Sequence, residues 1–378
     1  MRRNKVLLLN SLLIIALLTF NSGLNAGAYS GETLELKEIG QFQTAGWAAN
    51  VNVKGGTAYV AASEAGLYII DVTDPENPIE IGRYNATIDH IHALYVEGDL
   101  AYLGDYTLGL KIVNISDPTE PTLEGTFHDG GEVGAFEIIG NLAFIADFED
   151  GLEIVNITDP TDPEEIAQYN ATLNYLFNVE VYNDLAYVSD FISGTESRLR
   201  ILNISNLSDI EEIAEYTTEG EIFSIEFDGN IAYMMWSYGG VRIYDISNPL
   251  SLVEMGSYYD GGNAVDLEFY EGYTLVADRD DGVEILDTSD HDNIVEISHY
   301  CDGGSATNIA VVNDLVFVAD ADDGLEILQI EISTETTSTT STTTTGTGGS
   351  SLPIELLIVA ASTIAILAIV LVVKTRKE

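Results

Sequence analysis

The stretch GLEIVNITDPTDPEEIAQY, residues 151–169, decides the fold because it recurs along the chain. Related segments begin at Gly66, Gly109, Gly151, Arg198, Gly240 and Gly282, and a truncated one, GLEILQI, begins at Gly324. The successive spacings are 43, 42, 47, 42, 42 and 42 residues, and the longer one contains an insertion around FISGTES, residues 191–197. Seven copies at such a period indicate a repeat architecture in which neighbouring units complete one another's cores.

Each repeat contains four strand-like runs. In the third unit these are AFEIIG, LAFIAD, GLEIVNI and EEIAQY, separated by Gly, Asn, Asp-Gly and Asp-Pro turn signals. A period of about 40–45 residues with four strands is typical of propeller blades. The sequence therefore predicts an all-β fold, a seven-bladed β-propeller of four-stranded blades over residues 32–332.

The closure of the ring can also be predicted. Aromatic residues end the fourth strand of the first six units: Tyr84, Phe127, Tyr169, Tyr216, Tyr258 and Tyr300. The last unit lacks a fourth strand, whereas an upstream run, LELKEIGQF, ends at Phe42, 42 residues before Tyr84. We expect this N-terminal strand, about residues 34–42, to complete the last blade, because closure removes the exposed edges of an open array.

The repeat core, GL-x-I-V-[DN]-[IV]-[ST]-[DN]-P, resembles the LVIVD repeat family of bacterial and archaeal surface proteins, which is regarded as propeller-forming. The resemblance spans residues 34–330, and the sequence has no WD dipeptide, Kelch pattern or sialidase Asp box. It implies a surface location and a role in adhesion or binding. It implies no established activity, so it informs the fold more than the function.

The two ends of the chain predict secretion and anchoring. Residues 1–28 have the basic start, apolar run and small-residue site of a signal peptide. Residues 333–351 form a Thr/Ser/Gly-rich stalk, residues 352–373 a transmembrane helix and residues 374–378 a basic cytoplasmic tail. We expect a single-pass type I protein of the cell membrane with an extracellular propeller; removal of the tail after sorting is the alternative.

Charge and cysteine content exclude several classes of protein. The chain has 62 Asp and Glu against 14 Lys and Arg, and a surface this acidic repels nucleic acid. Its one cysteine, Cys301, cannot form an internal disulfide or a thiolate zinc site. With 46% hydrophobic residues, packing alone has to hold the core.

Strand direction sorts the loops onto two ends of the ring. The Asp-Pro turns join strands three and four on one end, where turn capping is the expected use of their acids. The loops after strand two lie on the other end, together with the loops that enter the next blade. We call this end the entry face.

Three blades share two acidic loops on the entry face. The pattern A-D-x-x-D-G precedes strand three and D-G-G enters the same blade, which gives Asp147, Asp150, Asp278, Asp281, Asp320 and Asp323 in the first pattern and Asp129, Asp260 and Asp302 in the second. Because both patterns occur in the same three blades and on the same face, we expect the two loops to touch. Carboxylates beside exposed backbone carbonyls suit Ca²⁺. Two alternatives remain: carboxylates that accept N–H bonds from the Gly-Gly turn, and duplication of both loops together. The pattern lacks the spaced acid and distal Glu of an EF-hand loop.

Other entry-face positions are aromatic or imidazole side chains: Trp47, His90, His92, Tyr175, Phe177, Phe191, Trp236 and Tyr238. Exposed rings beside acids suit stacking on a sugar or capture of a basic or hydrophobic peptide, and packing between blades is the alternative. His90 and His92 could present two imidazoles to a metal, but no third ligand is identifiable. All of them except Phe177 form the predicted ligand-binding set.

The sequence has six glycosylation sequons, of which Asn85 and Asn170 are the predicted acceptors because they follow strand four. Asn114, Asn156 and Asn203 occupy a repeat position that is Asp elsewhere and are expected to be structural. The sequence contains no nucleophile elbow, phosphate loop or zinc helix motif. We therefore expect a non-enzymatic, membrane-anchored binding or adhesion module that recognises a protein or glycan. A glycosidase-like hydrolase with channel carboxylates and a structural envelope or S-layer component are the alternatives.

Overall fold

The computed structural model describes residues 32–334, except 87, 149, 171–174, 194–195 and 238. The chain divides after Glu335 into two units, and all described residues belong to the first. The predicted signal peptide, transmembrane segment and tail lie outside the described residues, as does the predicted stalk beyond Thr334. Within the described part, no helix is long and apolar enough to cross a membrane.

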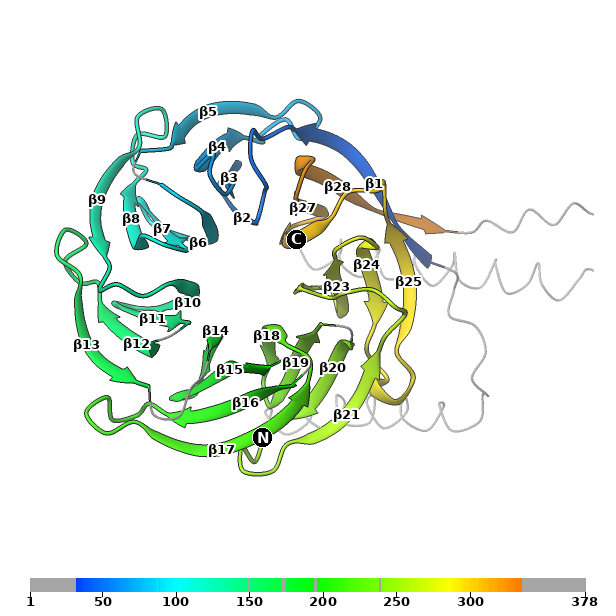
Figure 1. Ribbon diagram of the computed structural model, residues 1–378. Helices are drawn as coiled ribbons and strands as arrows, with labels where there is room; N and C mark the ends of the chain where they lie inside the picture. Colours follow the sequence, from blue (N-terminus) through cyan, green and yellow to red (C-terminus); the bar gives the residue numbers. More distant parts are fainter. Residues whose placement is uncertain are drawn as a thin grey trace, which may run out of the picture. The chain divides into compact units, whose positions relative to one another are not determined.

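Seven antiparallel sheets of four strands stand around a common axis (Figure 1). Blade one contains β2 (Asn50–Lys54), β3 (Thr57–Ala61), β4 (Leu67–Asp71) and β5 (Ile79–Tyr84). Blade two contains β6 (Ile91–Glu97), β7 (Leu100–Asp105), β8 (Gly109–Asn114) and β9 (Thr122–Phe127). Blade three contains β10 (Val133–Ile139), β11 (Leu142–Asp147), β12 (Gly151–Asn156) and β13 (Glu164–Tyr169). The predicted all-β propeller and its blade number are confirmed.

The remaining blades follow the same order, with the lowest-numbered strand innermost in blades four to six. Blade four contains β14 (Leu176–Tyr182), β15 (Leu185–Ser193), β16 (Glu196–Asn203) and β17 (Glu211–Glu219). Blade five contains β18 (Ile222–Asp228), β19 (Ile231–Trp236), β20 (Gly240–Asp245) and β21 (Val253–Tyr258). Blade six contains β22 (Asp266–Tyr270), β23 (Tyr273–Asp278), β24 (Gly282–Asp287) and β25 (Val295–Tyr300), with the short 3₁₀ turn η1 (His291–Asn293) before β25. The insertion in blade four lengthens β15 and β16.

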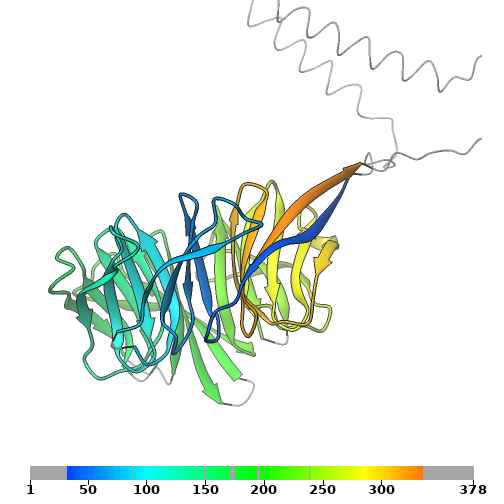
Figure 2. The same ribbon diagram turned by 90° about the horizontal axis from the view of Figure 1, so that it is seen from above.

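Blade seven closes the ring as predicted. It contains β26 (Ala306–Val312), β27 (Leu315–Asp320), β28 (Gly324–Thr334) and, as its outermost strand, β1 (Glu32–Phe42). The pairing of β1 with β28 runs from Phe42 opposite Leu325 to Glu32 opposite Thr334. Figure 2 shows these two strands leaving the ring together as a ribbon. The N- and C-terminal ends of the described chain are therefore hydrogen-bonded to each other.

Packing between blades holds the ring. Strands two and three are buried on both faces because each is covered by its neighbours, as in β11 and β12, where almost every residue is buried. One core cluster, for example, joins Tyr102 and Leu110 of blade two to Ile145 and Val155 of blade three. Burial of each such side chain stabilises the fold by ~1.5–3 kcal/mol. Cys301 is free and exposed, so the packing needs no help from a disulfide.

The Asp-Pro turns on the end opposite the entry face use their acids as predicted. Asn156 Oδ1 accepts hydrogen bonds from the Thr158 backbone N–H and hydroxyl, at 3.0 and 2.6 Å. Asp159 Oδ1 accepts the same two bonds from Thr161, at 3.0 and 2.7 Å. These local bonds pre-set the turn, which confirms Asn156 as a structural side chain.

Candidate functional site

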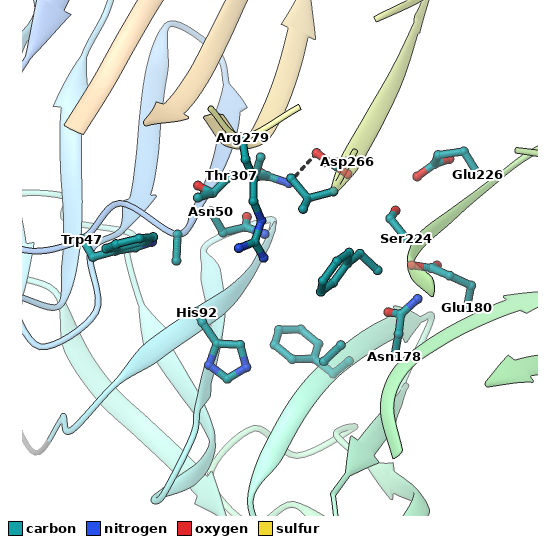
Figure 3. A pocket seen from close by; sticks show the side chains of 16 residues that line it. Trp47, Asn50, His92, Asn178, Glu180, Ser224, Glu226, Asp266, Arg279 and Thr307 are labelled. Atoms are coloured by element: carbon teal, nitrogen blue, oxygen red, sulfur yellow. Dashed lines mark hydrogen bonds between the residues drawn. The ribbon is translucent and has the colours of Figure 1, made fainter. Parts of the chain in front are cut away.

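A cavity of about 390 Å³ opens at the entry-face end of the inner strands. Its walls are formed by Trp47, Ala49, Asn50, His92, Ala135, Phe136, Asn178, Glu180, Phe223, Ser224, Glu226, Val265, Asp266, Arg279, Thr307 and Asn308. The lining residues come from all seven innermost strands and from entry-face loops, and Figure 3 shows the labelled side chains around the pocket. We call it the channel pocket. It combines aromatic surface with many hydrogen-bonding groups, which is the pattern of a small-molecule site.

Acidic side chains occupy one repeat position on four successive inner strands: Glu137 on β10, Glu180 on β14, Glu226 on β18 and Glu268 on β22. Burial raises the pKa of Glu137 and Glu268 to about 7 and that of Glu226 to about 8. Burial, and then repulsion from Glu137, also raises the pKa of Glu180. Carboxyl groups of the channel therefore retain protons near neutral pH. The predicted ligand-binding set lacks these acids, although an alignment of the inner strands would have shown that they share one repeat position.

Asp266 links the pocket walls of three blades. Its Oδ2 accepts hydrogen bonds from Asn308 Nδ2 at 2.6 Å and from the Ile309 N–H at 2.9 Å. Asn308 Oδ1 in turn accepts from the Val51 N–H of blade one at 2.8 Å. Burial raises the pKa of Asp266 to about 7 in spite of these bonds, which favour its charged form.

Arg279 brings a positive charge to the pocket. It lies in the entry-face loop after β23, with its backbone at a φ of 32°, which non-glycine residues rarely adopt. Its Cζ lies 5.1 Å from the centre of the Phe223 ring. Its Nε has no hydrogen-bond partner within the described part of the protein. The predicted ligand-binding set lacks Arg279, because its loop matches the acidic pattern A-D-x-x-D-G.

Two predicted ligand-binding residues line the channel pocket. Trp47 is 47% exposed and stands at its edge (Figure 3). His92 lies within 2.5 Å of the Gly134 carbonyl through Nε2, which fixes Nε2 as the donor, and Nδ1 has no partner among the described residues. Burial lowers the pKa of His92, so the ring is neutral with Nδ1 able to accept a hydrogen bond.

The other predicted aromatic and imidazole residues lie outside the pocket. Tyr175 stacks on Phe148 with ring centres 4.2 Å apart, and Phe191 contacts it edge-on at 6.5 Å. His90 points to solvent with Nδ1 3.6 Å from a Glu64 carboxylate oxygen. Its ring centre lies 6.5 Å from that of His92, and no histidine belongs to a metal-type cluster in the described residues.

Phe177 and Trp236 pack between blades, and the expectation of an exposed ring at Trp236 is wrong. Phe177 meets Phe223 edge-on at 6.0 Å. Trp236 is only 4% exposed and stacks under the guanidinium of Arg242, with Cζ 4.2 Å from the ring centre. It occupies the strand-two position that holds Asp105, Asp147, Asp190, Asp278 and Asp320 in other blades. Tyr238 lies outside the described residues.

Asn85 and Asn170 are both exposed on the entry face after strand four. Their sequon partners at 87 and 172 lie outside the described residues. Modification of these two asparagines stays a prediction.

The two acidic loops of blade three meet, as their coincidence suggests. Carboxylate oxygens of Asp129, Asp147 and Asp150 lie within 4.8 Å of one another. Asp129 also lies within that distance of Glu153 on β12 and Glu165 on β13. Glu153 is buried and faces the same side of the sheet as Asp147. The blade therefore concentrates carboxylates around Asp129.

Blades six and seven repeat this cluster with one change. Their groups are Asp260, Asp278 and Glu284 in blade six and Asp302, Asp320 and Glu326 in blade seven. Asp281 and Asp323 are not members; each instead donates a backbone N–H, at 2.8 Å, to the carbonyl of the Asp three residues earlier. The predicted metal-binding set lacks Glu153, Glu284 and Glu326. Each lies within a mostly apolar strand, so the sequence pattern does not mark it as part of a site. We call the three groups the acidic clusters.

The glycines of D-G-G have separate roles in these clusters. In blade six, Gly261 has a φ of 121°, a conformation that favours glycine. A Cβ on Gly262 would overlap the Asp278 carboxylate, so only glycine leaves room for it. The Asn263 N–H then donates to that carboxylate, and in blade seven the Ser305 N–H donates to Asp320 at 2.8 Å.

Comparison with known proteins identifies the family. The LVIVD repeat model matches seven consecutive segments, residues 45–86, 91–129, 130–171, 176–218, 219–260, 261–302 and 303–340. The chain belongs to the LVIVD repeat family. A search of curated proteins found no match. Among solved structures, the LVIVD protein is similar to the computationally designed Ika8 protein, with a TM-score of 0.58 and 12% identity over 80% of this chain and 100% of that chain. At this identity the likeness concerns the fold alone.

Proposed function

We propose that this LVIVD protein is a cell-surface binding module whose channel pocket holds a sugar residue of a glycan. The observation that carries the proposal is the composition of the pocket. A half-exposed indole, Trp47, lines the pocket together with the amides of Asn50 and Asn178 and the carboxyl groups of Glu226 and Asp266. A sugar ring offers one apolar face for the indole and a rim of hydroxyls for amides and carboxyls.

Protonation of the buried acids of the channel, which include Glu226 and Asp266 and are called the channel acids below, supports an uncharged ligand. A ring of ionised carboxylates would repel anions, whereas carboxyl groups with a pKa of about 7 or 8 can both donate and accept hydrogen bonds at neutral pH. Each sugar hydroxyl also donates and accepts. A basic peptide is the competing ligand, and it requires ionised acids.

A glycan array probed with the purified full-length chain tests the proposal. We expect retention of a defined set of neutral glycans and a loss of at least tenfold in affinity for Trp47→Ala. The matched control is Tyr259→Ala, because Tyr259 has a similar exposed fraction, 53% against 47%, but does not line the pocket. Equal retention by both variants, or binding of basic peptides in place of glycans, would contradict the proposal.

A hydrolase is the second candidate because the pocket holds a proton donor. Burial keeps Glu226 protonated at neutral pH, with a pKa of about 8, while Asp266 at about 7 is partly ionised. Unequal carboxyl groups of this kind serve as acid and base in glycoside hydrolysis. Release of the aglycone from aryl glycosides, abolished by Glu226→Gln, would favour this candidate; retention of intact glycans favours binding.

The location belongs to the same proposal. A signal peptide, a stalk and a C-terminal transmembrane segment at residues 352–373 would display the ring outside the cell. β1 and β28 end side by side, so the chain leaves the described propeller next to the point where it enters it. Protease shaving of intact cells should release the propeller. A structural envelope role would require self-assembly of the purified chain.

A further inference from the structure

We propose that the acidic clusters of blades three, six and seven each bind one hard divalent cation, with Ca²⁺ as the extracellular ion. The proposal concerns sites on the outer side of the blades and does not depend on the ligand of the channel pocket.

The first argument is uncompensated charge. In blade seven, Asp302, Asp320 and Glu326 place three carboxylates together, and Asp320 and Glu326 are buried. None of the three forms an ion pair with a described Lys, Arg or His. Removing ionised carboxylates from water is costly unless a positive charge lies beside them.

The second argument comes from the other blades. The repeat position of Glu153 is occupied by Lys111 in blade two and by Arg200 in blade four, and both are buried. Arg200 Nη2 lies 3.0 Å from Asp190, the counterpart of Asp147. Burial lowers the pKa of Lys111, and Asp105 opposes this shift because its carboxylate lies close to the ammonium group. The same strand-two Asp thus faces a built-in cation in two blades and a third acid in three blades.

The third argument is a pair of oxygens without partners. Glu153 Oε1 and Glu326 Oε1 form no hydrogen bond with any described group, although each side chain is only 1% exposed. Both glutamates contribute to the clusters. A buried oxygen left without a hydrogen-bond partner destabilises the folded state, more so when it is charged, and a cation in the cluster would satisfy it.

The chemistry of the clusters selects the ion. All side-chain ligands are carboxylate oxygens, and no His or Cys belongs to these groups in the described chain. Oxygen ligands from carboxylates, backbone carbonyls and water suit Ca²⁺, whereas Zn²⁺ and Cu²⁺ prefer nitrogen or sulfur. The competing arrangement is a proton shared between the Glu and the D-G-G Asp, since burial and the neighbouring acids raise the pKa of Glu153, Glu284 and Glu326 to about 9.

The test is cation stoichiometry on the full-length chain after treatment with EDTA. Calorimetric titration with Ca²⁺ should give three ions per chain, and Tb³⁺ should occupy the same sites, with tyrosine-sensitised emission that Ca²⁺ displaces. Titration with Mg²⁺ tests the ion class: binding at the same sites with the same variant dependence supports a hard divalent site. Absence of Ca²⁺ and Tb³⁺ binding at millimolar ion would overturn the proposal and leave the shared proton.

Variants assign the sites. Glu326→Gln should reduce the number of bound Ca²⁺ ions by one. Glu326→Lys should do the same, because the new ammonium group takes the role of Lys111 in blade two. The contribution of blade seven to the increase in melting temperature with Ca²⁺ should then be lost. The control Asp162→Asn removes an exposed acid from a turn on the opposite end and should retain all sites. Unchanged stoichiometry in Glu326→Gln and in a second single variant, Glu153→Gln, would refute the assignment. If either variant fails to fold, Tb³⁺ emission of the unmodified chain still decides whether ions bind.

Discussion

The guanidinium of Arg200 lies 3.0 Å from the carboxylate of Asp190, and both side chains are almost fully buried, 2% and 0% exposed. One blade earlier, the same two repeat positions hold Glu153 and Asp147. A single structural position therefore carries either a cation or an acid beside the same Asp. This exchange is the basis for the proposal that only some blades of one backbone shape bind an ion.

Arg200 should be essential to blade four. It contacts Glu212 at 2.7 Å and Glu215 at 3.0 Å as well as Asp190. Arg200→Met would remove the buried positive charge that these acids share and should lower the free energy of unfolding by about 3–5 kcal/mol. Unfolding by denaturant measures this loss of free energy. The control Arg198→Met loses only a half-exposed pair at 3.5 Å and should cost less than ~1 kcal/mol; equal losses would contradict the argument.

Ring closure should depend on the apolar face of β1. Leu34 is buried in the core cluster shared by blades six and seven. Leu34→Ala should cost ~2–5 kcal/mol, because it leaves a cavity where the terminal strands pair. On the same strand, Lys37 pairs with Glu331 in solvent, so Lys37→Ala should change stability by less than ~0.5 kcal/mol. Thermal melts compare the two; a loss for Lys37→Ala as large as for Leu34→Ala would count against closure by packing.

The channel acids should make stability fall as pH rises. Glu226 has a pKa of about 8 in the folded chain, raised by burial and then by Asp266, Glu268 and Glu137. An unfolded Glu titrates near ~4.3, so between these values the folded state holds more protons and loses stability as pH increases. Glu226→Gln should flatten the decrease between about pH 5 and 8 by at least ~1.4 kcal/mol, the value of one pKa unit. Unfolding at several pH values tests this, and an unchanged slope would exclude Glu226 as a source.

Gly262 should control the blade six cluster. A Cβ there would overlap the Asp278 carboxylate, so Gly262→Ala should displace it and remove one of the three proposed cations. Gly272→Ala is the control, because its Cβ would meet nothing, and its positive φ, 92°, strains the backbone without displacing a carboxylate. Calcium titration distinguishes the two; equal stoichiometry would show that Asp278 is not a ligand.

Much of this fold could be predicted because the repeat period reports blade number directly. The offset from Phe42 to Tyr84 also predicted the partner of β28, and the shared occurrence of D-G-G and A-D-x-x-D-G predicted that those loops touch. Each of these predictions rests on spacing along the chain, because in regular blades residues at equal spacing occupy equivalent positions.

Side-chain environments were harder to predict. Trp236 sits in an entry-face loop pattern, yet Arg242 covers it, and only the three-dimensional register places them together. Glu153 lies inside an apolar strand, and its neighbour Asp129 comes from the loop that enters the blade. The channel acids lie on strands whose inward face is set by ring closure. In each case the decisive neighbour comes from another element.

The most direct measurement is anomalous X-ray scattering from crystals of the protein grown with Ca²⁺ and, separately, Tb³⁺. We predict peaks beside Glu153, Glu284 and Glu326, and none beside Lys111 or Arg200, whose side chains already supply the charge. Empty clusters with Glu–Asp oxygens at hydrogen-bond distance would contradict the assignment and show that these acids share protons instead.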